Sequence, residues 1–267
     1  VTHLAAKDAR LANWLHGEHR VQAPVLAFPM AGDAARRIFL ERWPDLVKRA
    51  DQLRDDGFDT VIVAPFSDVS APKRAAGQLA EFRAEVLLFV EALEEITLRE
   101  SNKPDRIWRK RRLEGGQFAL ELTTEGEVVQ QTWIVRHHDG VIPENAREDG
   151  GATHYKCAMA IRTDTATSPQ PLHVFFPTSL MVPLPVLLHA TLELDSSRKL
   201  LNENSSANAH VLEGLATFMA ASLEELADAE LLPDPVARLN LAEKIPKDLS
   251  IFEERLFEEA AHRRLVE

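Results

Sequence analysis

Residues 171–201 read PLHVFFPTSLMVPLPVLLHATLELDSSRKLL, and this stretch decides the expected fold. The apolar run Leu172–Pro177 has the length of a buried strand and is too short to cross a membrane. Three prolines between residues 177 and 185 then exclude a helix and predict an extended connection. A second strand is predicted over Val186–Leu194. It ends in a polar corner, Asp195–Lys199, that can hold one charged side chain at a fixed place beyond the sheet edge.

Further strands and helices are predicted on both sides of this stretch. Residues 155–162 are expected to form a strand that pairs with Leu172–Pro177, and Glu125–Gly126 is expected to form a hairpin turn. Apolar patterning predicts the other strands over residues 58–64, 107–113, 117–123 and 128–136, and helices over residues 77–94, over 211–227 and from Ser250 onward. Helices and strands alternate irregularly, so the expected class is α/β or α+β with a mainly antiparallel or mixed sheet.

Composition limits the function classes. The chain has 267 residues, enough for a sizeable core and two lobes. Its 42 acidic and 31 basic residues leave a net charge of −11, which disfavours nucleic acid and anionic membrane surfaces as partners. The single cysteine, Cys157, excludes an intrachain disulfide and a thiolate zinc site, and it is typical of a cytoplasmic protein. No apolar run reaches about 18 residues, so no membrane span is predicted.

The sequence contains no familiar catalytic or nucleotide-binding motif. G-x-G-x-x-G, G-x-x-x-x-G-K-[ST], H-E-x-x-H and G-x-S-x-G are all absent. His137-His138-Asp139 is predicted as a turn, and chelation by both histidines is disfavoured because adjacent side chains in an extended chain point in different directions. No metal site is therefore predicted. Cys157 is interpreted as a small core residue, and the residues alone predict an α/β protein without a complete active site.

Several short elements in a fixed order resemble a known family. They are G-F-D-T-V-I at residues 57–62, a helix with E-x-L-L-F over residues 79–98, F-F-P-T at 175–178, L-P-V-L-L-H-A at 184–190 and L-E-L-D-S-S-R at 192–198. This order resembles the sacsin-type and related bacterial members of the GHKL ATPase superfamily, which includes the Hsp-ninety chaperones and gyrase. The resemblance covers about residues 20–225.

The resemblance implies a domain organisation and a function. Residues 1–70 are expected to be the end of a GHKL-type ATP-binding sandwich, and residues 71–230 a ribosomal S5-like transducer, or middle, domain with a mixed sheet and flanking helices. Residues 231–267 are expected to be a linker and a C-terminal helix. The implied function is to couple the state of bound ATP and Mg²⁺ to conformational change.

The resemblance also implies three site residues. Arg198 matches the arginine of the L-N-x-S-R element in the Hsp-ninety middle domain, and it is expected to reach the γ-phosphate as the catalytic residue. Thr60 is expected near the phosphates, and Lys199 is a less favoured cofactor-binding residue. Without the resemblance, Arg198 is interpreted as a surface arginine that caps a loop or pairs with Glu193 or Asp195.

Large parts of the family's nucleotide pocket are absent from the sequence. These are the glutamate–asparagine helix, the D-x-G-x-G turn and the G-x-x-G-x-G lid. The chain also begins at Val1 without a methionine. We therefore expect it to be the C-terminal part of a longer ATPase, in which another region binds most of the ATP and Mg²⁺. Its expected partner is that N-terminal ATPase region or a separate protein, with a homodimer as a further expectation.

Two other interpretations stay open. The chain can be a non-enzymatic scaffold or dimerisation module that uses the helices after residue 207. It can also be a nucleic-acid-processing component that uses the basic strip Arg106–Arg112, although the acidic balance argues against this. For His189, on an apolar strand, a buried core histidine is favoured over a catalytic base.

Overall fold

A computed structural model describes residues 41, 44–57, 70–100, 102–148, 150–163, 169–202, 205–232, 234, 236–239, 244–263 and 265. The chain divides into two compact units, Val1–Ala80 and Glu81–Glu267. The described helices of the first unit are α4 (Pro44–Asp55) and α5 (Ala71–Ala80). Pro44 begins α4, where its fixed φ suits the first turn. The strand predicted over residues 58–64 lies outside the described residues.

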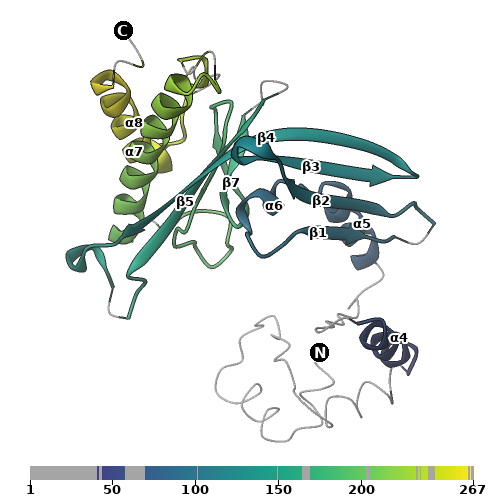
Figure 1. Ribbon diagram of the computed structural model, residues 1–267. Coiled ribbons are helices and arrows are strands. Elements are labelled where there is room, and N and C mark those ends of the chain that lie inside the picture. The colour runs from purple at the N-terminus through teal and green to yellow at the C-terminus, as the bar shows by residue number, and fades with distance from the viewer. Residues whose placement is uncertain are drawn as a thin grey trace, which may run out of the picture. The chain divides into compact units, whose positions relative to one another are not determined.

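The second unit is built on an eight-stranded sheet with the order β1-β2-β3-β4-β5-β8-β6-β7 (Figure 1). All neighbouring strands are antiparallel except β6 and β8, which are parallel, so the sheet is mixed, and it is curled. The strands are β1 (Glu95–Leu98), β2 (Arg106–Arg112), β3 (Gln117–Thr124), β4 (Glu127–Val141), β5 (His154–Arg162), β6 (Gln170–Val174), β7 (Phe176–Val182) and β8 (Leu187–Ala190). The expectation of a mixed sheet with flanking helices is confirmed at this level.

The first part of the sheet is a meander that follows the predicted strands. Glu125 and Gly126 both have positive φ, 53° and 84°, which is the geometry of a two-residue type I′ hairpin turn. The strand β4 continues to Val141, and its residues 133–141 pair with the whole of β5. The predicted turn at His137-His138-Asp139 is therefore wrong, because these residues continue the strand.

The second part of the sheet differs from the predicted pairing. The strand β5 pairs with β8 and not with β6, because β6 forms its own hairpin with β7. Phe175 is the turn residue of that hairpin, and its φ of 61° is unusual for a side chain of this size. Pro177 lies in β7, the last strand of the sheet, where a missing N–H is tolerated.

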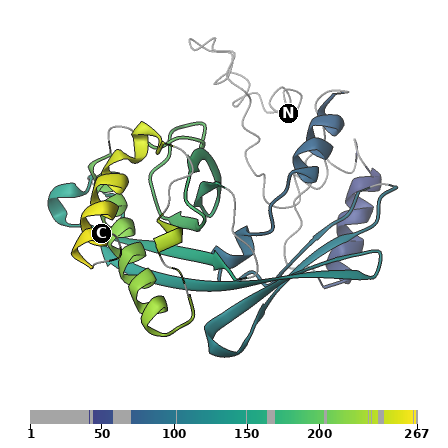
Figure 2. The same ribbon diagram turned by 90° about the horizontal axis from the view of Figure 1, so that it is seen from above.

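Two hydrophobic cores lie on opposite faces of the sheet, as the alternation along β5 shows. Cys157 and Met159 belong to one core, and Ala158 and Ala160 belong to the other. The first core is completed by α7 (Ser206–Asp228) and α8 (Ser250–His262), which lie next to each other (Figure 2). The second core is completed by the one-turn helix α6 (Val86–Phe89).

The helix predicted over residues 77–94 is not continuous. The helix α5 ends at Ala80, and only Val86–Phe89 are helical further on. All four side chains of α6 are buried, so this segment is a fully buried apolar turn in the second core and not an amphipathic surface helix. The predicted helix near residues 211–227 is confirmed as α7. Four short 3₁₀ turns complete the described structure: Glu114–Gly116, Glu144–Ala146, Val236–Arg238 and Lys247–Leu249.

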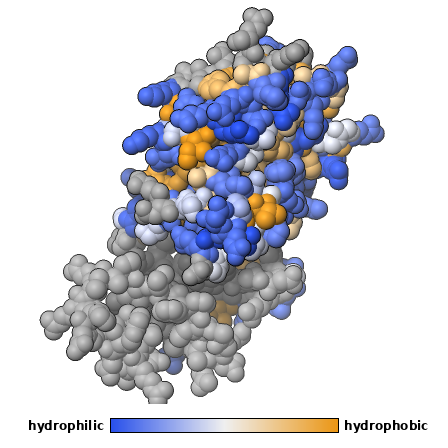
Figure 3. All heavy atoms as spheres, turned by 90° about the vertical axis from the view of Figure 1, so that its left-hand side faces the viewer, coloured by the Kyte–Doolittle hydropathy of each residue, from blue (hydrophilic) through white to orange (hydrophobic). Residues whose placement is uncertain are grey.

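The surface is largely polar where it can be seen. Figure 3 shows one face on which hydrophilic side chains surround small, separate hydrophobic patches. Within the described residues, no helix is both long enough and apolar enough to cross a membrane.

Candidate functional site

The predicted polar corner is a tight loop that one carboxylate organises. An isolated bridge between Leu194 and Leu201 closes the loop. The carboxylate of Asp195 accepts hydrogen bonds from the Ser197 hydroxyl at 2.7 and 2.8 Å and from the Lys199 backbone N–H at 3.1 Å. It also accepts one from the backbone N–H of Leu200 at 3.3 Å. These hydrogen bonds, the one from Ser197 above all, lower the pKa of Asp195.

The base of this loop is fixed to the sheet and to α7. The backbone N–H of Ser179 in β7 donates to the carbonyl of Lys199 at 2.9 Å. The amide side chain of Asn208, in the first turn of α7, bonds both the N–H and the C=O of Glu193, at 2.7 and 2.8 Å. It also donates to the carbonyl of Asn202 at 3.2 Å. Asn208 is buried, so the loop base and the start of α7 are held as one piece.

Arg198 lies at the exposed tip of the loop. Its φ of 58° is in the left-handed region, and its N–H donates to the carbonyl of Asp195 at 3.0 Å. Among the described residues, no carboxylate oxygen lies within 4.0 Å of its guanidinium, and the Asp195 carboxylate is occupied by its own loop. Lys199 is exposed beside it. The corner therefore presents cationic side chains that can meet an anion.

The third predicted site residue, Thr60, lies outside the described residues. Asn208 is the residue that sequence reasoning missed. A polar segment before an apolar helix is typical of a helix cap, and the cap of α7 is Ser205, which accepts from the Asn208 N–H at 3.2 Å. Only the fold brings the Asn208 side chain to Glu193.

The basic strip Arg106–Arg112 forms β2, and most of its charges are already paired. Arg106 bonds Glu100 at 3.2 Å, Arg109 bonds Glu95 at 2.6 Å and Arg111 bonds Glu121 at 2.7 Å. The ammonium of Lys110 donates to the carbonyl of Val90 at 2.8 Å. Such a strand offers little free charge to phosphates, so these contacts do not favour the nucleic-acid interpretation.

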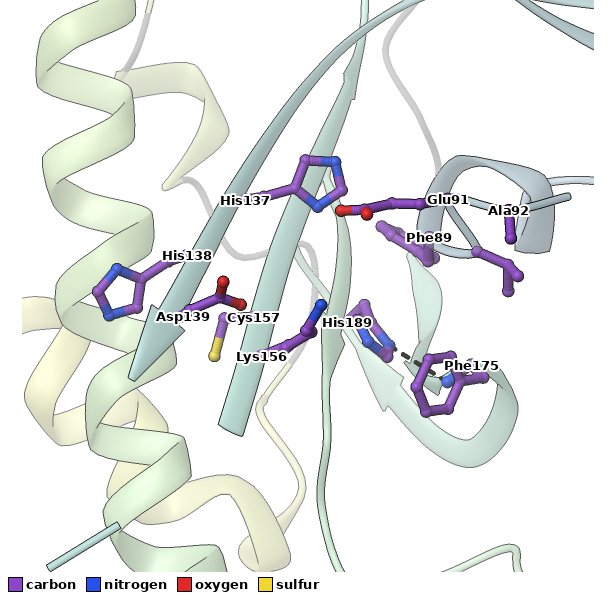
Figure 4. A pocket seen from close by; sticks show the side chains of 11 residues that line it. Phe89, Glu91, Ala92, His137, His138, Asp139, Lys156, Cys157, Phe175 and His189 are labelled. Atoms are coloured by element: carbon purple, nitrogen blue, oxygen red, sulfur yellow. Dashed lines mark hydrogen bonds between the residues drawn. The ribbon is translucent and has the colours of Figure 1, made fainter. Parts of the chain in front are cut away.

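A cavity of about 330 Å³ lies elsewhere in the second unit, between β4, β5, β8, the end of α6 and the β6–β7 hairpin (Figure 4). Its charged lining residues are Glu91, Asp139 and Lys156. Asp139 and Lys156 are direct register partners on β4 and β5, yet they form no ion pair within 4.0 Å in the described part of the chain. Sequence reasoning missed this set because it ended β4 before residue 137.

The rest of that cavity's lining consists of three histidines, two phenylalanines and the smaller residues Val90, Ala92 and Cys157. His189 is 3 % exposed and stacks on Phe89 at a ring-centroid distance of 5.3 Å, and Phe175 lies 4.9 Å from it. Burial lowers the pKa of His189 to about 4, so its ring is neutral at pH 7. The Glu91 carboxylate points toward His137, whose own pKa is lowered by burial (Figure 4).

Comparisons with protein-family models, curated proteins and solved structures found no match to this chain. The described structure by itself defines the class of this chain, which is mixed α/β with a curled eight-stranded sheet and C-terminal helices. Across the described residues, no group of three or more histidine, cysteine, aspartate or glutamate side chains is placed to hold a metal ion.

Proposed function

We propose that this chain is the transducer, or middle, region of an Hsp-ninety-like, sacsin-type GHKL ATPase. In this proposal Arg198 contacts the γ-phosphate of ATP, and another region of the ATPase binds most of the nucleotide and its Mg²⁺. The observation that carries the proposal is the exposed guanidinium of Arg198, unpaired within the described structure, on a loop whose backbone is fixed by Asp195 and Asn208.

The physical argument rests on preorganisation. A transferring phosphoryl group develops charge on its oxygens, and a guanidinium held in place beforehand stabilises that charge without reorganisation at the moment of reaction. Asp195 supports this role because it orders the loop without neutralising the arginine. A bidentate guanidinium also suits phosphate geometry better than the ammonium of Lys199.

The same contacts provide a route for coupling. The loop base is bonded to Asn208 at the start of α7, and α7 packs against α8 in one core. In the proposed function, a displacement of Arg198 and its loop on phosphate binding is therefore transmitted to the first turn of α7. Because packed helices move as units, a small shift at the loop can change the position of both helices.

The test uses the longer ATPase that contains this region. Arg198→Ala is expected to lower kcat by about 100-fold or more while the nucleotide Kd changes only a few-fold, because the contact is made mainly in the transition state. Arg198→Lys is expected to recover only part of the rate. Arg112→Ala is the matched control, because Arg112 is also an exposed arginine. Equal turnover of the Arg198→Ala variant and the parent protein would refute the role of Arg198.

The 267-residue chain alone supplies a second test. We expect no measurable ATP hydrolysis, because the rest of the pocket belongs to another region in this proposal. ATP turnover by this chain alone, abolished by Arg198→Ala, would contradict that division of labour. A coupled phosphate-release assay distinguishes the two results.

A further inference from the structure

The cavity beside β4 and β5 takes no part in the proposed phosphate contact, and its lining combines aromatic and charged side chains. Its floor is aromatic and buried, with Phe89 and His189 stacked on each other. Its mouth is charged and exposed, with Asp139 on β4 and Lys156 on β5. An apolar floor below a few placed polar groups is the usual design of a small-molecule site.

His189 brings a buried polar group to this floor. Its Nδ1 lies 3.2 Å from the backbone nitrogen of Phe175 and 3.2 Å from the carbonyl oxygen of His173. A buried N–H without an acceptor is rarer than a carbonyl with a spare lone pair, so we assign Nδ1 as the acceptor of the Phe175 N–H. The ring proton then lies on Nε2, which has no hydrogen-bond acceptor among the described residues.

The charges at the mouth define the kind of ligand. Asp139 and Lys156 face the same side of the sheet in direct register, but no ion pair joins them in the described structure. Each is left able to meet an opposite charge. Glu91 adds a second carboxylate on the other side of the cavity. A ligand with both an ammonium and a carboxylate group uses all of these side chains, whereas a ligand with one charge leaves some of them unused.

The hairpin that forms one wall is under local strain. Phe175, with a φ of 61°, holds its ring 4.9 Å from His189 and is 43 % exposed. A bulky residue in the left-handed region costs free energy, and such outliers concentrate at ligand-binding sites. The strain places an aromatic face beside the cavity, where it can cover an apolar group.

We propose that this cavity binds a small zwitterion with an apolar side chain, the chemical class of a free α-amino acid. The ammonium group lies at Asp139, with Glu91 facing it across the cavity, and the ligand's carboxylate lies at Lys156. The apolar side chain lies on the rings of Phe89 and Phe175. A volume of about 330 Å³ suits a ligand of this size.

The experiment titrates the whole 267-residue chain with three probes and follows binding by calorimetry or NMR. L-phenylalanine carries both charges, phenethylamine carries only the ammonium, and 3-phenylpropionate carries only the carboxylate. L-phenylalanine is expected to bind at least about tenfold more tightly than either of the others. Equal binding of phenethylamine, or no saturable binding of L-phenylalanine up to about 10 mM, overturns the proposal.

Variants at the mouth locate the binding. Lys156→Ala and Asp139→Asn are each expected to weaken L-phenylalanine about tenfold, and both positions are exposed, so the fold is retained. Lys156→Ala is expected to leave phenethylamine binding unchanged or stronger. Lys247→Ala is the matched control, because it removes an exposed lysine outside the cavity. An equal loss in Lys247→Ala and Lys156→Ala places the binding elsewhere and overturns the proposal.

Discussion

At the scale of single residues, Asp195 organises the polar corner. Its carboxylate accepts hydrogen bonds from Ser197, Lys199 and Leu200. These bonds favour the charged carboxylate, which is why its pKa lies below the ordinary value of 3.8. The loop therefore keeps its hydrogen bonds above the ordinary pKa of an aspartate and loses them only as pH falls through the lowered pKa.

Replacing Asp195 by alanine is expected to loosen the loop while the rest of the chain keeps its stability. The backbone N–H of Leu200 loses its acceptor, and that of Lys199 keeps only the longer contact to the Ser197 hydroxyl at 3.3 Å. Their hydrogen exchange is expected to speed up by about tenfold or more. Exchange measured by NMR at pH 7 tests this. Asp234→Ala is the control, because that carboxylate accepts from the N–H of Ala237 in a separate turn. Unchanged exchange at residues 199 and 200 would contradict the role of Asp195.

The corner was predictable in part. A run of aspartate, serines, arginine and lysine after an apolar strand indicates a polar turn, and the structure shows one. The clamp by Asn208 was not predictable, because nothing local indicates that an amide will reach back 15 residues to Glu193. The cavity residues Asp139 and Lys156 meet through strand register, which no motif records.

At the scale of elements, Tyr155 joins β4 and β5 to α7. A Cβ on Gly140 of β4 would lie 2.1 Å from Cζ of the Tyr155 ring, and a Cβ on Gly214 of α7 would lie 2.2 Å from its hydroxyl oxygen. Both glycines are therefore needed for the close approach of this ring. Glycine inside a helix costs about 1 kcal/mol relative to alanine, so the packing around Tyr155 outweighs the helix propensity at Gly214.

Gly214→Ala is expected to destabilise the chain by about 1–3 kcal/mol despite its better helix propensity, because the added methyl group overlaps the Tyr155 hydroxyl. Tyr155→Phe removes the oxygen and is expected to recover part of this loss in the double variant. The same rescue is expected to fail for Gly140→Ala, where the nearest atom is a ring carbon. Urea unfolding of the single and double variants measures the coupling. Equal rescue at both glycines would show that the hydroxyl is not the obstacle.

Gly140 also explains why the end of β4 was misplaced. A sequence of histidines, aspartate and glycine after an apolar run is typical of a turn. Here Gly140 is present because Tyr155 approaches the backbone closely, and the strand continues through it to Val141. The helix predicted over residues 77–94 fails for a related reason. Its apolar periodicity continues through Val86–Phe89, but that segment is buried on all sides.

At the scale of the whole chain, the second unit buries two histidines beside its smaller core. His173 is fully buried on β6, and His189 lies in register with it on β8. Phe89 of α6 lies against both rings, at 5.2 and 5.3 Å. Within the described structure neither ring nitrogen of His173 has a hydrogen-bond partner. Burial lowers the pKa of each histidine to about 4.

This arrangement predicts a loss of stability in mild acid. The unfolded chain takes up protons near the ordinary histidine pKa of 6.5, whereas the folded chain resists them down to about pH 4. The contribution of these neutral rings to the free energy of unfolding is complete above pH 6.5. It falls as pH drops from 6.5 to 4, by about 3 kcal/mol for each histidine. Free energies of unfolding in urea at pH 7.5 and 4.5 test this.

His173→Phe isolates the effect, because it keeps an aromatic ring against Phe89 and removes the titrating group and its unpartnered nitrogens. Between pH 6.5 and 4, unfolding of this variant is expected to take up about one proton fewer than unfolding of the parent chain. Its free energy of unfolding therefore depends less steeply on pH. If His173→Phe and the parent chain lose the same free energy between pH 7.5 and 4.5, His173 is not the group that the fold keeps neutral.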